Sequence, residues 1–266
     1  MVVLITGASS GIGRALASHY LDRGTAVAAI ARRGAALHGL HRPDARLAIF
    51  TVDVADRARM EAVVSEVERA LGPIHLAIAC AGVAEHEIGP DNLMLEGLAL
   101  MLATNTVGAF NTLVPAAAAM RARGDGHIVA ISSLAALHGI PIMAGYCMSK
   151  AALESGMQSL RHALHNTGVQ VSVIAPGFVA TEMTVGRVAP VFCMPLERAV
   201  QRIVAAIERR WPVYRFPLWQ HAVIRILPLL TARAQSSLLA RLTLLGLPVA
   251  PFPQGARRRD ERLDNG

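Results

Sequence analysis

Short apolar runs alternate with longer amphipathic stretches along the first 217 residues. The apolar runs are expected to be strands, at residues 2–6, 25–30, 47–52, 74–79, 127–132, 169–175 and 213–217. Helical patterns lie between them, at 12–23, 56–71, 92–122 and 146–166. Runs that are apolar throughout are typical of parallel strands buried on both faces. The pattern therefore predicts an α/β fold with a doubly wound parallel sheet and helices on both faces.

Nothing in this pattern divides residues 1–218, which are expected to form a single domain, followed by a helical C-terminal extension over 219–266. The chain is 53% hydrophobic and 17% charged, which excludes disorder as its main state. Its three cysteines form no C-x-x-C pair, so neither a disulfide framework nor a metal site is expected, and His86 between Glu85 and Glu87 is no metal signature. The N-terminus enters an apolar run directly, as expected of a cytoplasmic protein.

Positive charge is concentrated toward the C-terminus. Nine arginines and no acidic residue lie between Arg209 and Arg259, and subtracting these nine from the net charge of +7 leaves −2 on the rest. Residues 219–247 are rich in Leu, Ile and Val, but Pro228 and regularly spaced arginines keep every run below the length of about 18 apolar residues that spans a membrane. Peripheral membrane contact through 219–247, docking on a partner subunit and packing on the chain's own core all remain open. Nucleic-acid binding is not expected, because groove-reading elements are missing.

A glycine-rich turn follows the first apolar run, with the sequence Thr6-Gly7-Ala8-Ser9-Ser10-Gly11-Ile12-Gly13. Such a turn at a helix N-terminus offers free N–H groups and a positive dipole to a pyrophosphate, although tight packing alone also explains glycines here. After the second strand, Arg32 and Arg33 occupy the region where an NAD site carries a carboxylate. They suit a 2′-phosphate and predict NADP(H) over NAD(H), the alternative being two solvated arginines.

Tyr146 and Lys150 are four residues apart in a helical pattern, so both project from one helix face. Lys150 is the only lysine among 26 basic residues. Its ammonium is expected to lower the pKa of the phenol, which could then exchange a proton with a substrate oxygen. Ser133 follows a strand at the edge where ligands bind, and its hydroxyl can hydrogen-bond a carbonyl oxygen. A surface tyrosine and a capping serine are the alternatives.

Together, Thr6-Gly7-x-x-x-Gly11-x-Gly13, Ser133 thirteen positions before Tyr146, and Tyr146-x-x-x-Lys150 resemble the short-chain dehydrogenase/reductase family over about residues 1–215. The resemblance implies a Rossmann-type fold, a homodimer or homotetramer, and hydride transfer between NADP(H) and a carbonyl or secondary alcohol. It implies the catalytic residues Asn105, Ser133, Tyr146 and Lys150, with Asn105 supporting a water-mediated proton relay. The cofactor-binding residues are expected to be Gly7, Ser9, Ser10, Gly11, Ile12, Gly13, Arg32, Arg33, Asp53, Val54, Ala81, Gly82, Tyr146, Lys150, Pro176, Gly177, Val179 and Thr181.

Two regions bear on how far the resemblance extends. Cys80 stands where the family has asparagine before Ala81-Gly82, which puts local hydrogen bonding in doubt more than catalysis. The resemblance places a substrate lid at 182–210, whose apolar members predict a lipid- or steroid-like ketone or alcohol as substrate, although helix packing explains them almost as well. These members are Met183, Val185, Val188, Val191, Phe192 and Met194. The alternative function is a non-catalytic NADP(H)-binding regulator or membrane-recruited scaffold with the same fold.

Overall fold

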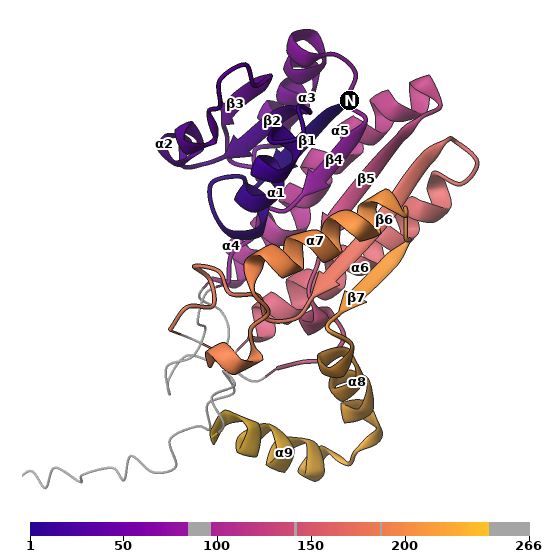
Figure 1. Cartoon of the computed structure of the whole chain (residues 1–266). Coiled ribbons are helices and arrows are strands. Elements are labelled where there is room, and N and C mark those ends of the chain that lie inside the picture. The colour runs from indigo at the N-terminus through magenta and orange to yellow at the C-terminus, as the bar shows by residue number, and fades with distance from the viewer. Residues whose placement is uncertain (85–96, 141–142, 187, 245–266) are drawn as a thin grey trace, which may run out of the picture.

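A computed structural model of the chain describes residues 1–84, 97–140, 143–186 and 188–244 (Figure 1). The continuously apolar runs form a seven-stranded parallel sheet in the order β3-β2-β1-β4-β5-β6-β7. The strands are β1 (Val2–Thr6), β2 (Ala26–Ala31), β3 (Leu47–Thr51), β4 (Leu76–Ala79), β5 (Gly126–Ile131), β6 (Val169–Pro176) and β7 (Val213–Phe216). The predicted doubly wound, Rossmann-type fold is confirmed, and its topological switch point lies between β1 and β4.

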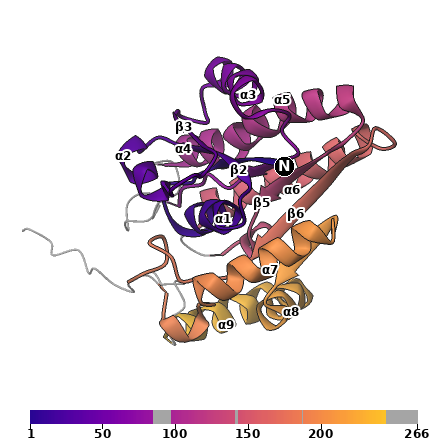
Figure 2. The same ribbon diagram turned by 45° about the horizontal axis from the view of Figure 1, so that its top comes forward.

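Helices cover both faces of this sheet (Figure 2). The helices are α1 (Gly11–Leu21), α2 (Gly34–Leu37), α3 (Arg57–Leu71), α4 (Leu98–Met101), α5 (Gly108–Arg123), α6 (Ala144–Ala163), α7 (Leu196–Glu208), α8 (Leu218–Ile226) and α9 (Ala232–Leu244). Side chains of α3, α5 and α6 form one hydrophobic core with the sheet, and side chains of α1 and α7 form the other. Strands buried on both sides in this way must be apolar throughout, which is the pattern found in the sequence.

The helix expected at 92–122 is not a single α-helix. Residues 92–96 lie outside the described part, and a π-helical turn (Leu102–Val107) separates α4 from α5. Among the described residues, the run Leu98–Arg123 is long and apolar enough to cross a membrane by length and composition. Its side chains Leu113, Ala116 and Met120 are buried in the core against the sheet. The run is therefore a core helix of this fold.

The segment 182–210, expected to be a lid, contains a core helix in its second half. Ala199, Ile203 and Ala206 of α7 are buried to 1% exposure or less, and α7 packs against α1 and β6. A helix bound to the sheet in this way cannot move with a lid. The part that can cover the cleft is therefore narrower than expected and ends before α7 begins.

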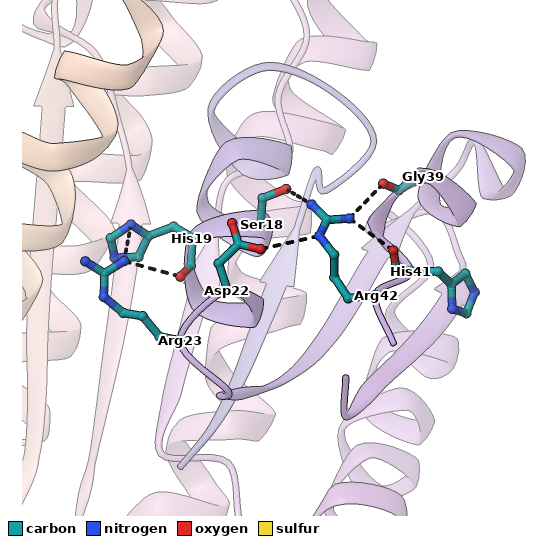
Figure 3. Close-up of polar contacts among 7 residues, drawn as sticks. All are labelled: Ser18, His19, Asp22, Arg23, Gly39, His41 and Arg42. Carbon is teal, nitrogen blue, oxygen red and sulfur yellow. Dashed lines mark hydrogen bonds and ion pairs between the residues drawn. The ribbon is translucent and has the colours of Figure 1, made fainter. Parts of the chain in front are cut away.

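Polar contacts attach the segment after β2 to α1 (Figure 3). The Arg42 guanidinium donates to Asp22 Oδ1 at 3.3 Å and to Ser18 Oγ at 3.5 Å on α1, and also to the carbonyl oxygens of Gly39 and His41. These groups are largely exposed, so they contribute little to stability. They fix the course of the chain that follows Arg32 and Arg33.

The extension begins as a helix that touches the domain. α8 starts directly after β7 and contacts it, and Figure 1 shows α8 and α9 below the end of the sheet where the carboxyl ends of the strands meet. Pro228 lies in the 3₁₀ turn Leu227–Leu229 between the two helices, where the sequence places a break. The basic end at Arg257–Arg259 lies outside the described residues.

Candidate active site

A cleft of about 770 Å³ opens at the carboxyl ends of the strands, next to the switch point between β1 and β4. It extends from the glycine turn after β1 to α8 of the extension. Most of the residues proposed from the sequence line it, namely Gly7, Ser9, Ser10, Gly11, Ile12, Gly13, Arg32, Arg33, Val54, Ala81, Gly82, Ser133, Tyr146, Lys150, Pro176, Gly177, Val179 and Thr181. Of the proposed residues, Asp53 and Asn105 are not part of this lining; Asp53 is partly exposed, whereas Asn105 is buried.

The glycines of the turn have two different roles. A Cβ at Gly13 would lie 2.3 Å from the Gly7 carbonyl oxygen, so Gly13 allows α1 to pack close to the turn. Gly11 has a φ of +50° and lies at the N-terminus of α1, where the cleft is open to a ligand. The Ser10 hydroxyl at this terminus accepts a hydrogen bond from Arg33. Close packing and an anion site are therefore combined in one turn.

The switch point is held together by Thr6. Its Oγ1 accepts hydrogen bonds from the backbone N–H groups of Cys80 at 3.2 Å and Ala81 at 3.3 Å. These bonds keep the end of β4 beside the glycine turn although Cys80 stands in place of asparagine. Burial raises the pKa of the Cys80 thiol to about 12, so this thiol is not a nucleophile at neutral pH.

Two guanidiniums line the cleft beside the glycine turn, one bonded to two hydroxyls and the other near a carboxylate. Arg33 Nη2 lies 3.0 Å from Ser10 Oγ and 3.4 Å from Ser9 Oγ. Arg32 Nη1 lies 3.8 Å from Asp53 Oδ2, and Asp53 also accepts from the backbone N–H of Ala55. Asp53 thus holds Arg32 rather than lining the cleft. This group of donors suits a phosphate, and the glycine cradle beside it suits a dinucleotide.

Ser133, Tyr146 and Lys150 converge on the middle of the cleft. Ser133 follows β5 and caps a 3₁₀ turn, with Oγ accepting from the Ala135 N–H at 3.2 Å, and it hydrogen-bonds the Tyr146 hydroxyl. Lys150 lies one turn after Tyr146 on α6. Its Nζ donates to the Ile131 carbonyl oxygen at 2.9 Å and lies 5.8 Å from the centre of the Tyr146 ring.

The protonation of this group differs from the sequence-based expectation. Burial raises the pKa of Tyr146 to about 12, because desolvation outweighs the hydrogen bond from Ser133 that favours the phenolate. Burial also lowers the pKa of Lys150 to about 8, against opposing effects of Cys80 and Glu154. The expected lowering of the phenol pKa is wrong for this geometry. Tyr146 is therefore a protonated phenol at neutral pH, suited to donate a proton.

Asn105 connects the cleft to α6 from behind. It is fully buried in the π-helical turn, a feature common at functional sites. Its Oδ1 accepts from the Val83 N–H at 2.8 Å, and its Nδ2 donates to the Val83 carbonyl oxygen and to Ser149 Oγ, each at 2.9 Å. Ser149 precedes Lys150, so the Asn105 side chain is bonded to α6 next to Lys150.

The substrate side is built from different residues than the sequence indicates. Of the six apolar lid residues, Met183 and Val188 line the cleft, whereas Val185 and Val191 are exposed and Met194 packs against the core of α1 and α7. Gln220 and Ile224 of α8 also line the cleft and are absent from the sequence-based proposal. The available signal is their spacing, since residues four apart on a helix share a face.

Known proteins are similar to this chain in sequence and in fold. A family model described as short chain dehydrogenase matches residues 1–190. The chain is 39% identical over 227 residues to an uncharacterized oxidoreductase of Myxococcus xanthus, covering 83% of this chain and 88% of that protein. It is 32% identical over 183 residues to the 3-oxoacyl-[acyl-carrier-protein] reductase MabA of Mycobacterium avium, covering 68% of each. A short chain dehydrogenase from Burkholderia cenocepacia, solved in complex with NADP, has a TM-score of 0.76 and 25% identity, covering 91% of this chain and 96% of that one.

Proposed function

The chain belongs to the short-chain dehydrogenase/reductase family of oxidoreductases, and on that premise we propose that it reduces the carbonyl group of an apolar, lipid- or steroid-like substrate with NADPH, or oxidises the corresponding secondary alcohol. The observation that carries the proposal is the convergence of Ser133, Tyr146 and Lys150 in one cleft with the glycine turn. The NADP-bound structure from Burkholderia cenocepacia supports NADP(H) as the cofactor.

The cofactor would be held by the residues that line the cleft on the side of β1. The N-terminus of α1 with Gly11 would bind the pyrophosphate, and Arg32 and Arg33 the 2′-phosphate. Lys150 would hold the ribose beside the nicotinamide, and Pro176–Thr181 would orient the ring. The chemistry supplied by bound NADPH is the hydride.

The three converging side chains then complete the reduction. The Ser133 hydroxyl orients the substrate carbonyl by donating a hydrogen bond to its oxygen. Tyr146 transfers its phenolic proton to that oxygen as negative charge develops there. The Lys150 ammonium stabilises the tyrosinate that remains. Because the phenol is protonated at neutral pH, it can act as the proton donor when the carbonyl is reduced.

An apolar substrate is supported by apolar side chains in the lining of the cleft. These include Leu134, Ile140, Met143, Phe178 and Ile224. A cleft of this kind binds a hydrophobic ketone better than a sugar, because few polar groups would satisfy sugar hydroxyls. A panel of lipid ketones, steroids and aldehydes tests the proposal by NADPH consumption. A protein that binds NADPH and consumes none with any of them would instead be a cofactor-binding regulator.

The outer face of α8 supports a location at a membrane. We define this face as Trp219, Val223, Ile226 and Leu229, whose side chains are 40% to 81% exposed. The exposed Arg225 and Arg233 lie nearby, and the sequence from Arg209 to Arg259 contains no acid. Exposed apolar side chains among unopposed arginines complement an anionic lipid surface. We propose a cytoplasmic protein that contacts this surface peripherally; a homodimer or homotetramer also remains part of the proposal.

The full chain is expected to sediment with vesicles containing phosphatidylserine and to be released by salt, because the arginines bind through charge. Changing Trp219, Val223 and Ile226 to Ser is expected to weaken this partitioning by about tenfold or more, since apolar area is lost from the contact. The control variant carries Val107→Ser at the end of the π-helical turn and Val114→Ser on α5, both at exposed positions. Unchanged sedimentation together with a lower oligomeric mass would make the outer face a subunit interface and refute the membrane proposal.

A further inference from the structure

α8 presents a second face toward the cleft, about a third of a turn around the helix from its outer face. Gln220 and Ile224 lie one helical turn apart on this inner face, and both line the cleft. We propose that the inner face of α8 is the wall that determines substrate specificity, with Ile224 contacting the substrate and Gln220 acting as a positioning residue. The inference rests on the proposed function, and it places specificity in a helix beyond the residues that match the family model.

Gln220 joins two segments that are far apart in the sequence. Its Oε1 accepts from the Phe178 N–H at 3.1 Å, and its Nε2 donates to the Phe192 carbonyl oxygen at 2.8 Å. The side chain is buried, with 7% exposed. A Cβ at Gly177 would lie 1.8 Å from Gln220 Oε1, so the glycine before Phe178 makes room for this amide. Gln220 therefore fixes the chain directly after β6.

The same contacts hold the base of the lid. Met194 pairs with the chain after β6, donating to the Phe178 carbonyl oxygen at 2.8 Å and accepting from the Ala180 N–H at 2.9 Å. The lid leaves the core after Ala180 and returns at Phe192, where Gln220 holds it. Met183 and Val188 reach the cleft from this loop. The position of both side chains thus depends on where the two ends of the loop are held, and Gln220 of α8 is hydrogen-bonded to both ends.

Only a side chain with both a donor and an acceptor satisfies this position. A glutamate has the same shape and still accepts from the Phe178 N–H. Once ionised, however, it turns an oxygen toward the Phe192 carbonyl oxygen, and two acceptors repel each other. Protonation of that glutamate restores a donor. The variant Gln220→Glu therefore makes the contact dependent on pH without changing its size.

Gln220→Glu is expected to lower kcat/KM for an apolar ketone by roughly tenfold at neutral pH, the usual effect of one lost buried hydrogen bond. The kcat/KM of the variant should recover toward the wild-type value as the pH falls and the glutamate is protonated. Hydrogen exchange of the Met194 amide, which bonds the Phe178 carbonyl oxygen at the base of the lid, should become faster in parallel, because repulsion at Phe192 loosens that base. This readout requires no turnover. The matched control, Gln201→Glu, makes the same chemical change at an exposed position of α7.

The outcomes separate this inference from the proposed function. If no ketone is turned over but exchange at Met194 follows the pH as expected, the positioning role stands and the reductase proposal is wrong. If exchange and the pH profile of kcat/KM both match the wild type, Gln220 does not position the lid base and this inference is refuted.

Ile224 is tested with a series of methyl ketones of increasing chain length. Ile224→Phe is expected to lower kcat/KM for the longest ketones by about tenfold and to spare the shortest, because apolar pockets discriminate by volume. Ala222→Phe is the control, since it adds the same ring at an exposed position of the same helix. An equal loss of kcat/KM for short and long ketones would exclude Ile224 as a substrate contact.

Discussion

Tyr146→Phe is expected to reduce kcat for ketone reduction by about 10²- to 10⁴-fold, the range that a positioned general acid contributes. The substitution removes only the hydroxyl that hydrogen-bonds Ser133 and leaves the ring beside Lys150. The affinity for NADPH, measured by fluorescence titration, is therefore expected to stay near the wild-type value. Stopped-flow measurement of NADPH oxidation gives the rate of the chemical step directly.

Tyr214→Phe is the matched control. Its hydroxyl accepts a hydrogen bond from Arg202 at 3.1 Å, and Tyr214 lies outside the residues that line the cleft. Loss of this hydroxyl is expected to leave kcat unchanged. If Tyr146→Phe reduced ketones at the wild-type rate, the assignment of Tyr146 as proton donor would be wrong.

The raised pKa of Tyr146 also predicts how the rates of oxidation and reduction depend on pH. Alcohol oxidation needs the tyrosinate as base, and with a pKa of about 12 its population rises with pH throughout the neutral and alkaline range. Oxidation by the wild type is therefore expected to accelerate as pH rises, whereas reduction slows once the phenol loses its proton. Both slopes should disappear in Tyr146→Phe.

The sheet and the cleft are predictable from sequence because each depends on local patterns. Strands buried on both faces need runs without polar residues, and a parallel sheet places their carboxyl ends at one edge. Ser133 and the glycine turn therefore lie near each other in any such fold. The spacing of Tyr146 and Lys150 then brings a phenol and an ammonium to the same edge from one helix face.

The lid boundary could have been found from the sequence as well. Ala199, Ile203 and Ala206 repeat at intervals of three and four residues, the pattern of a helix packed on a core. The lid expected over 182–210 from the family resemblance includes this helical stretch. The structure shows that the amphipathic stretch is α7.

Other features depend on contacts that no local pattern contains. Gln220 lies 42 residues from Phe178 in the sequence, and only the return of α8 to the cleft brings them together. The pKa of Tyr146 depends on how far the folded chain excludes water from the phenol, a quantity that spacing alone does not give. Long-range packing thus determines both the contacts of Gln220 and the protonation of Tyr146.

Arg32→Ala is expected to weaken NADPH binding by about 10- to 100-fold, the effect of losing one charge-assisted hydrogen bond worth about 1.5–3 kcal/mol. NADH lacks the 2′-phosphate, so its affinity should change by no more than about twofold. Arg32 is half-exposed and held only by Asp53 at 3.8 Å, so its removal leaves the fold intact. Isothermal titration with both cofactors measures the ratio.

Arg33 differs from Arg32 because it also contacts the glycine turn through Ser9 and Ser10. Arg33→Ala is therefore expected to weaken both cofactors, and NADPH more than NADH. Arg57→Ala, which removes an exposed guanidinium paired with Glu61 on α3, serves as the charge-matched control and should change neither affinity. Raising the salt concentration should weaken NADPH binding to the wild type more steeply than to Arg32→Ala, because the variant has lost a charge contact that salt screens. If Arg32→Ala lost equal affinity for NADPH and NADH, the assignment of a 2′-phosphate site to this end of the cleft would be wrong. The arginines would then be solvated surface charges.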